Sequence, residues 1–174
     1  MTNKNFVRRV TNGKRDILEE FITLLRKNKV PFCVIGGLGV NAYAEPVVSL
    51  DMDVVIIIDR LGDISPHLAR MYKVKKYPNS VNISSPFSDL RIQIQTDPRY
   101  QSFIGRAVSR DVLGYKMPVA AIEDLLQGKI WAAQDKTRRL SKRQKDLADI
   151  MRLVETRRGL ARLLPASLRK KLAI

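Results

Sequence analysis

Apolar positions along the chain follow two periods, and the change from one to the other predicts an α/β body followed by helices. Residues 14–29 place apolar side chains at helical spacing. Residues 90–96 alternate apolar and polar positions, so that Arg91, Gln93 and Gln95 share one face of a half-buried strand. Beyond Gly114 and its flanking strands, the pattern becomes helical to the end of the chain.

The remaining segments predict short strands and helices. Further strands are expected at 31–37, at 50–59 and on both sides of Gly114. Further helices are expected at 38–44, 63–74, 121–134 and 141–155. We therefore expect an α/β core over 1–120 and a helical, basic part over 121–174 that packs on this core in one folding unit.

Composition places the chain among globular proteins. With 174 residues, of which 45% are hydrophobic, it is long enough for one domain with a real core. The longest apolar run, 54–58, is far shorter than the ~18 residues of a membrane span. A single cysteine, Cys33, excludes an intramolecular disulfide and is expected to be a buried thiol. We expect a cytoplasmic protein without a membrane partner.

Charge adds a candidate partner. The chain has 32 basic and 17 acidic residues, and residues 136–174 hold thirteen of the former against three of the latter. Such a surplus attracts polyanions, although a solvated basic tail without a specific partner is the alternative. The densest segment supplies four candidates for binding an RNA backbone: Arg138, Arg139, Lys142 and Arg143.

Two acids stand at the start of the most apolar strand. Alternation places Asp51 and Asp53 on the same face, where their charges repel and disfavour burial. Mg²⁺, or Mn²⁺, would remove that cost because hard cations take oxygen ligands. Gly36 and Gly37, at the end of the preceding strand, could let backbone N–H groups approach a phosphate. Together these residues predict a site for a metal and a triphosphate.

The same glycines admit a second interpretation. Gly37, Gly39 and Ala42 satisfy a dinucleotide-binding string, and Asp59 stands where an acid would bond a ribose. The string leaves about eight residues for a crossover helix, whereas a parallel crossover normally needs a dozen or more. It also gives the acidic pair no role, so we rank this interpretation last.

Residues 35–56 resemble the signature of the nucleotidyltransferase superfamily, which has a polymerase-beta-like fold: Gly-Gly after a strand, then Asp-x-Asp between apolar residues. Residues 118–153 resemble the helical part of its AbiEii-type branch of toxins and minimal nucleotidyltransferases. The resemblance implies a mixed sheet flanked by helices, which binds a nucleoside triphosphate and Mg²⁺. It also implies transfer of a nucleoside monophosphate to an acceptor hydroxyl, with release of pyrophosphate.

The resemblance also implies roles for individual residues. Asp51 and Asp53 would be the catalytic metal ligands. The nucleotide would be bound by residues from both matched segments: Gly36, Gly37, Ser49, Lys129, Lys145 and Asp146. Lys129 has independent support, because it lies in the middle of the apolar stripe of its helix, where a lysine must reach past its neighbours or meet an anion. It would assist catalysis by contacting the triphosphate.

One expected carboxylate is missing. Such enzymes usually take a third carboxylate from a neighbouring strand, and Gln93 stands at that position. Glutamine is neutral and cannot act as a base. Asp89 and Asp97 flank the strand, but either would need a bend or a register shift to replace it. Two hypotheses stay open: an active nucleotidyltransferase with an altered metal site, and a weak or inactive protein that binds nucleotide or RNA.

The acceptor also stays open at this point. The AbiEii branch includes toxins of toxin–antitoxin pairs, some of which modify tRNA ends, so a tRNA acceptor and a cognate antitoxin are what the resemblance implies. A protein hydroxyl or a small molecule is an alternative acceptor.

Overall fold

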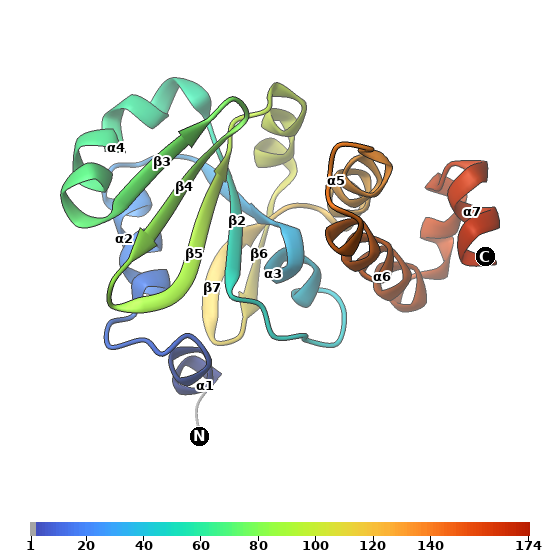
Figure 1. Cartoon of the computed structure of the whole chain (residues 1–174), viewed down its shortest axis with the longest axis horizontal. Coiled ribbons are helices and arrows are strands. Elements are labelled where there is room, and N and C mark those ends of the chain that lie inside the picture. The colour runs from blue at the N-terminus through green and yellow to red at the C-terminus, as the bar shows by residue number, and fades with distance from the viewer. Residues whose placement is uncertain (1–2) are drawn as a thin grey trace.

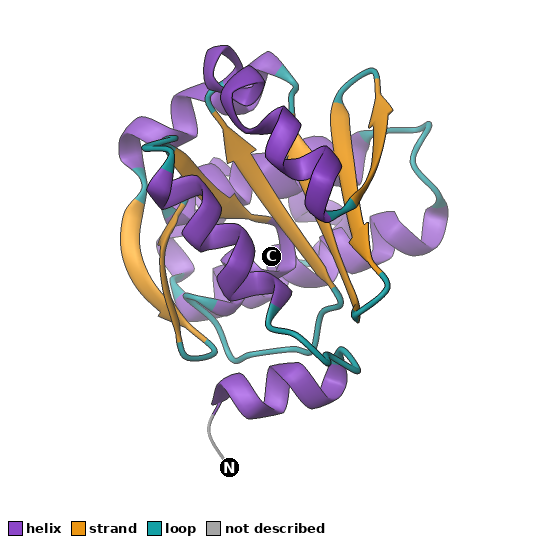
Figure 2. Cartoon of the chain, turned by 90° about the vertical axis from the view of Figure 1, so that its left-hand side faces the viewer, coloured by secondary structure: helices purple, strands orange, loops and turns teal. Residues whose placement is uncertain are grey.

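The computed structural model describes residues 3–174 and contains one mixed sheet with helices on its two sides (Figures 1 and 2). The strands are β1 (Phe32–Ile35), β2 (Asp51–Ile56), β3 (Lys73–Tyr77), β4 (Ser80–Ser85), β5 (Ser88–Gln95), β6 (Val108–Val112) and β7 (Tyr115–Val119). The helices are α1 (Asn3–Val10), α2 (Ile17–Lys27), α3 (Gly36–Asn41), α4 (Ile58–Met71), α5 (Ile122–Gln134), α6 (Leu140–Thr156) and α7 (Ala166–Leu172). Two 3₁₀ segments complete the chain, η1 (Pro98–Arg106) and η2 (Arg158–Leu163).

The sheet has the order β3-β4-β5-β2-β1-β7-β6. Its centre is mixed: β1 runs antiparallel to β2 and parallel to β7, while β2 runs parallel to β5. The outer strands are antiparallel hairpins, β3–β4–β5 at one edge and β6–β7 at the other. Figure 1 shows α2 and α4 on one side of the sheet and α5, α6 and α7 on the other. The predicted α/β class with a flanked mixed sheet is confirmed.

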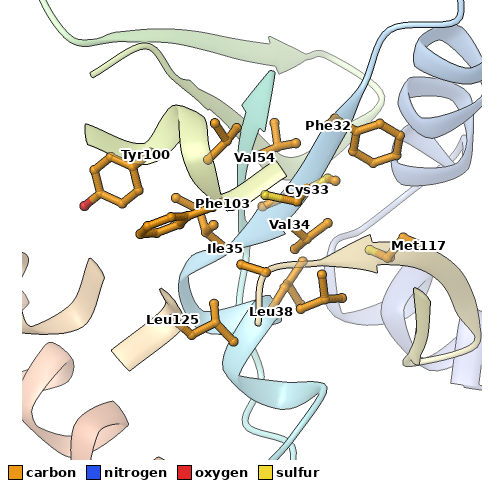
Figure 3. Close-up of a cluster of buried hydrophobic side chains, with 14 of the residues drawn as sticks. Phe32, Cys33, Val34, Ile35, Leu38, Val54, Tyr100, Phe103, Met117 and Leu125 are labelled. Atoms are coloured by element: carbon orange, nitrogen blue, oxygen red, sulfur yellow. The ribbon is translucent and has the colours of Figure 1, made fainter. Parts of the chain in front are cut away.

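The core is built around β1, the strand that is covered on both faces. All four of its residues are buried, which matches its unbroken apolar sequence. Figure 3 shows its side chains meeting Met117 of β7, Phe103 of η1 and Leu125 of α5. Cys33 is fully buried there, as predicted, and burial raises the pKa of its thiol to about 12.

Two sequence expectations fail against this topology. The dinucleotide interpretation requires parallel strands on either side of its glycines, but β1 and β2 are antiparallel and α3 has only six residues. That interpretation is wrong, and Asp59 lies in the first turn of α4. The helix predicted at 63–74 starts earlier, at Ile58, and its last residues belong to β3.

The β3–β4 hairpin escaped prediction because β3 is almost entirely polar. No helix in the described part of the chain is long and apolar enough to cross a bilayer.

Candidate functional site

A cleft of about 390 Å³ opens over β2, β5, β4 and β3 on the side where α5 and α6 lie. We call it the carboxylate cleft. Its acidic lining residues are Asp51, Asp53 and Asp146. Its basic ones are Lys73, Lys75, Arg91, Lys129, Arg138, Lys142 and Lys145. Uncharged lining residues include Gly37, Ser49, Asn82 and Gln93.

The acidic pair shares one face of β2, as predicted. Met52, between the two acids, is fully buried on the opposite face. Asp51 meets two cations: its Oδ1 lies 2.8 Å from Arg91 Nε, and its Oδ2 lies 3.8 Å from Lys142 Nζ. The serine before it, Ser49, holds the strand entrance, because its hydroxyl donates to the Asp51 carbonyl and accepts from the Asp51 amide. Asp51 is thus positioned by both its backbone and its neighbours.

Asp53 is half-buried and has no hydrogen bond or ion pair with any residue in 3–174. Burial raises the pKa of its carboxyl, and the charge of Asp51 adds to that rise. The positive charges of Lys129, Arg138 and Lys145 oppose it without cancelling it. An unpaired carboxylate beside a second one is a group that a cation would stabilise.

Gly36 makes room for that carboxylate. Its φ is +66°, in the left-handed region, and a Cβ built there would stand 2.0 Å from Asp53 Oδ2. At Gly37 a Cβ would meet only the Ser49 side chain, at 3.6 Å. Gly36 therefore lies against Asp53 and Gly37 lies beside Ser49, and the first glycine is required by both its backbone angle and its neighbour.

Gln93 lies directly across from Asp53 on the parallel strand β5. This register places it at the position expected for the third carboxylate. Neither flanking acid replaces it. Asp89 accepts from Asn12 Nδ2 at 2.6 Å, and Asp97 forms an ion pair with Arg99 at 2.7 Å; neither lines the carboxylate cleft.

Lys129 is buried on α5 and meets two anions, both of them carboxylates of α6. Its Nζ lies 3.0 Å from Asp146 Oδ1 and 2.7 Å from Asp149 Oδ2. Burial lowers the pKa of Lys129, but these two carboxylates raise it by more, so that it stands above its usual value of 10.5. The lysine that interrupts the apolar stripe is therefore charged and paired inside the protein.

Two arginines extend this contact into a network. Arg138 Nε donates to Asp146 Oδ2 at 2.8 Å. Arg152 lies 2.8 Å from Asp149 and donates to the Asn41 side chain of α3 at 2.8 Å. Asn41 in turn holds Val47 in the loop that leads to β2. The network thus joins α5 and α6 to the segment between the glycines and the acidic pair.

Of the other basic residues singled out from the sequence, some line the carboxylate cleft and some do not. Lys142 and Lys145 line the carboxylate cleft from α6, and Lys145 has no ion pair among residues 3–174. Lys145 and Asp149 stand four residues apart on α6, a spacing that allows an ion pair. Asp149 is instead paired with Lys129 and Arg152.

Of the two remaining RNA candidates, Arg139 is exposed and does not line the cleft. Arg143 donates to the Ala133 carbonyl at 2.9 Å.

The acidic pair fits a single divalent cation. Carboxylate oxygens are the ligands that Mg²⁺ prefers, and Asp53 lacks any other cation in contact. The described residues contain no group of three or more His, Cys, Asp or Glu that could hold a metal ion. The oxygen ligands that the carboxylate cleft offers a cation are therefore those of Asp51 and Asp53, with Asp51 also beside Arg91 and Lys142.

Several solved structures resemble the fold of this chain over most of their length. ANT(2'')-Ia in complex with adenylyl-2''-tobramycin matches with a TM-score of 0.64 and 11% identity, over 89% of this chain and 96% of that one. The lincosamide antibiotic adenylyltransferase LnuA, lincomycin-bound, matches with a TM-score of 0.57 and 13% identity, over 81% and 98%. The chain has the nucleotidyltransferase fold.

An antigenic nucleotidyltransferase-like protein from Paracoccidioides brasiliensis also has this fold, with a TM-score of 0.54 and 16% identity, over 90% of this chain and 88% of that one. The amino-acid sequence matches no protein-family model, and it matches no curated protein. The narrower resemblance to the AbiEii-type branch stays a prediction.

The structure adds cleft residues that the sequence did not suggest, namely Lys73, Lys75, Asn82 and Arg91. The first three lie on the unpredicted β3–β4 hairpin. A signal for β4 was present, since Val81 and Ile83 alternate with polar neighbours in the manner of a half-buried strand.

Proposed function

We propose that this protein binds a nucleoside triphosphate with Mg²⁺ or Mn²⁺ in the carboxylate cleft and transfers a nucleoside monophosphate to an acceptor hydroxyl. The observation that carries the proposal is Asp53, a half-buried carboxylate without a hydrogen-bond or ion-pair partner among residues 3–174, beside Asp51 and against Gly36. A structural role would leave such a group paired, whereas a ligand role leaves it unpaired until the ligand binds.

Each residue has a part in that reaction. Asp51 and Asp53 would hold the cation, which neutralises charge on the phosphates and stabilises the pyrophosphate leaving group when bound. Gly36 and Gly37 would turn backbone N–H groups to the phosphates, with Ser49 beside them. Lys142 and Lys145 add positive charge at the cleft wall. Lys129 and Asp146 hold α5 and α6 in place through their ion pair.

Gln93 favours a second candidate function, a catalytically weak or inactive binder of nucleotide or RNA. It stands opposite Asp53 where a carboxylate would accept the proton of the attacking hydroxyl, and its amide cannot do so. Water would have to accept that proton, so turnover is expected to be slow.

The acceptor is constrained by charge. Seven basic and three acidic residues line the carboxylate cleft. Such a surplus disfavours an acceptor with several ammonium groups, such as an aminoglycoside, and favours an anionic one. A tRNA end fits this chemistry, and a toxin with a cognate antitoxin would be the corresponding biological role.

The test is calorimetric titration of each nucleoside triphosphate with Mg²⁺ and with EDTA, together with an assay of pyrophosphate release. Asp53→Asn should abolish Mg²⁺-dependent binding. Asp89→Asn, a matched change outside the cleft, should leave it intact. Equal binding by wild type and Asp53→Asn, or none to any triphosphate, would refute the proposal.

Gln93→Asp separates the two candidate functions. If the wild type binds Mg²⁺–triphosphate without turnover and Gln93→Asp releases pyrophosphate, the native protein is a binder. Turnover by the wild type that Asp51→Asn abolishes supports the enzyme.

A further inference from the structure

The sheet carries polar side chains from the acidic pair out to its edge. In one cross-strand row, Asp53 of β2 pairs with Gln93 of β5, Gln93 with Asn82 of β4, and Asn82 with Lys75 of β3. Two residues away on β3, Lys73 pairs with Ser84. All five residues of these pairs beyond Asp53 line the carboxylate cleft. The cleft therefore continues from the acids to two lysines on the last strand.

The lysines lie beyond the reach expected of the nucleotide site. Neighbouring strands are about 4.8 Å apart, so β3 lies about 14 Å from β2, three spacings away. A triphosphate held between the glycines and the acidic pair approaches β2 from its other side, because β1 and α3 lie opposite β5. The strip from Gln93 to Lys75 is thus left for a different ligand.

Several polar groups of this strip have no ion-pair or hydrogen-bond partner among residues 3–174. Lys73 and Lys75 are exposed and form no ion pair among residues 3–174. Asn82 Oδ1 is shielded from solvent and has no hydrogen-bond partner in the described part of the chain. Arg91, which also lines the cleft, is mostly exposed, at 64% of its side chain, and among the described residues its one ion pair is with Asp51. The positive charge on these exposed side chains matches a ligand that carries phosphate groups.

A structural explanation exists for lysines on this strand. Lysine on an edge strand discourages pairing with another sheet. That explanation applies equally to Lys76, which alternates to the other face of β3 and does not line the cleft. Edge protection alone does not account for the side on which Lys73 and Lys75 stand, next to Asn82 and Ser84.

We propose that Lys73 and Lys75 bind backbone phosphates of a single-stranded nucleic acid, the acceptor of the reaction proposed above. The chain of the acceptor would cross β4 and β5, with its terminal hydroxyl towards Asp51 and Asp53. Phosphate contacts of this kind set register and orientation without reading sequence. The inference rests on the proposed function for the direction of the strand, but binding itself can be measured without catalysis.

The experiment compares wild type with Lys73→Gln/Lys75→Gln and with the control Lys76→Gln. Binding of a fluorescent single-stranded RNA oligonucleotide is followed by anisotropy over a series of salt concentrations, without nucleotide. The double variant should bind several-fold more weakly. The slope of log affinity against log salt should become less steep by about 1.4, because each lost single-strand phosphate contact removes about 0.7 from its magnitude. Lys76→Gln should keep the wild-type slope.

Titration of Mg²⁺–triphosphate into the same variants separates this inference from the proposed function. Unchanged triphosphate affinity in the double variant supports a separate acceptor site. A parallel loss of triphosphate affinity would assign the lysines to the nucleotide and overturn the inference, as would an equal loss of RNA affinity in Lys76→Gln. If no variant binds triphosphate but the RNA slope depends on Lys73 and Lys75, the proposed function fails and the lysine site stands.

Discussion

The two walls of the carboxylate cleft differ in how their charges are paired, apart from the Asp51–Arg91 pair on the sheet and the unpaired Lys145 on α6 among residues 3–174. On the helical wall, Lys129, Arg138, Asp146, Asp149 and Arg152 are paired with one another at 2.7–3.0 Å. On the sheet wall, Asp53, Asn82 Oδ1, Lys73 and Lys75 have no contact of this kind within 3–174. Removing one partner of a buried ion pair destabilises a structure, whereas polar groups left unpaired are available to a ligand. The contrast distinguishes scaffold from binding surface.

The largest expected effect comes from breaking the helical wall at its centre. Lys129→Met leaves Asp146 and Asp149 buried without their shared cation, and should lower the free energy of unfolding by about 3–5 kcal/mol. Urea denaturation followed by circular dichroism measures this change.

Lys145→Met is the matched control, because it removes a lysine from the same cleft that has no ion pair in residues 3–174. Its effect should stay within about 0.5 kcal/mol. Equal destabilisation by the two variants would erase the contrast between paired and unpaired charges.

A smaller effect is expected at Gly36, which lies against Asp53 of the sheet wall. Gly36→Ala forces a side chain into a left-handed φ of +66° and onto the Asp53 carboxylate. Stability should fall by about 1–3 kcal/mol, and Mg²⁺–triphosphate binding should fall with it. Gly62→Ala is the control, since a Cβ there meets nothing within 4 Å. Thermal unfolding and calorimetry measure both effects, and full triphosphate affinity in Gly36→Ala would contradict the prediction.

Asp53→Asn should change the free energy of unfolding in the opposite direction to a matched change on the helical wall. Because Asp53 is half-buried, unpaired and close to Asp51, neutralising it removes a desolvation and repulsion cost, and we expect stability to rise by about 1 kcal/mol. The same change on the helical wall, Asp146→Asn, should lower stability. Chemical denaturation of the two variants in metal-free buffer gives both values, and a loss of stability in Asp53→Asn would show that this carboxylate has a structural partner.

The smallest effect is that of pH near neutrality. The pKa of Lys129 is raised in the folded state by Asp149 and Asp146, so the folded protein holds this proton more tightly than the unfolded chain does. Its contribution is therefore fully present below about pH 10.5 and is lost as pH rises through the folded pKa. The stability difference between wild type and Lys129→Met should stay constant from neutral pH to that limit and shrink above it.

Much of the chemistry was readable from the sequence because it followed local rules. The acidic pair and Met52 obey strand alternation. The position of Lys129 within an apolar stripe indicated either a side chain that reaches past its neighbours or a contact with a triphosphate, whereas its partners in the structure are Asp146 and Asp149. The register that sets Gln93 against Asp53 depends on contacts between distant strands, yet the polar alternation of residues 90–96 pointed to the correct face.

The predictions that failed concern features that are set by contacts between elements, such as strand pairing and ion pairs between helices. β3 has a single partly buried apolar residue, Val74, so hydrophobic pattern could not reveal it; its strand conformation comes from hydrogen bonding to β4. Helical periodicity extended α4 into β3 for the same reason. The partners of Asp149 could not be read from spacing within α6 either, because Lys129 reaches it from another helix.

The position of β3 at the margin of the sheet has an evolutionary consequence. Its outward residues support neither the acids nor the glycine turn, so substitutions there can alter which molecules are attracted while leaving the acidic pair untouched. Under the proposed function, a scaffold organised in this way exchanges one class of acceptor for another by changing a few charges on its outermost strand.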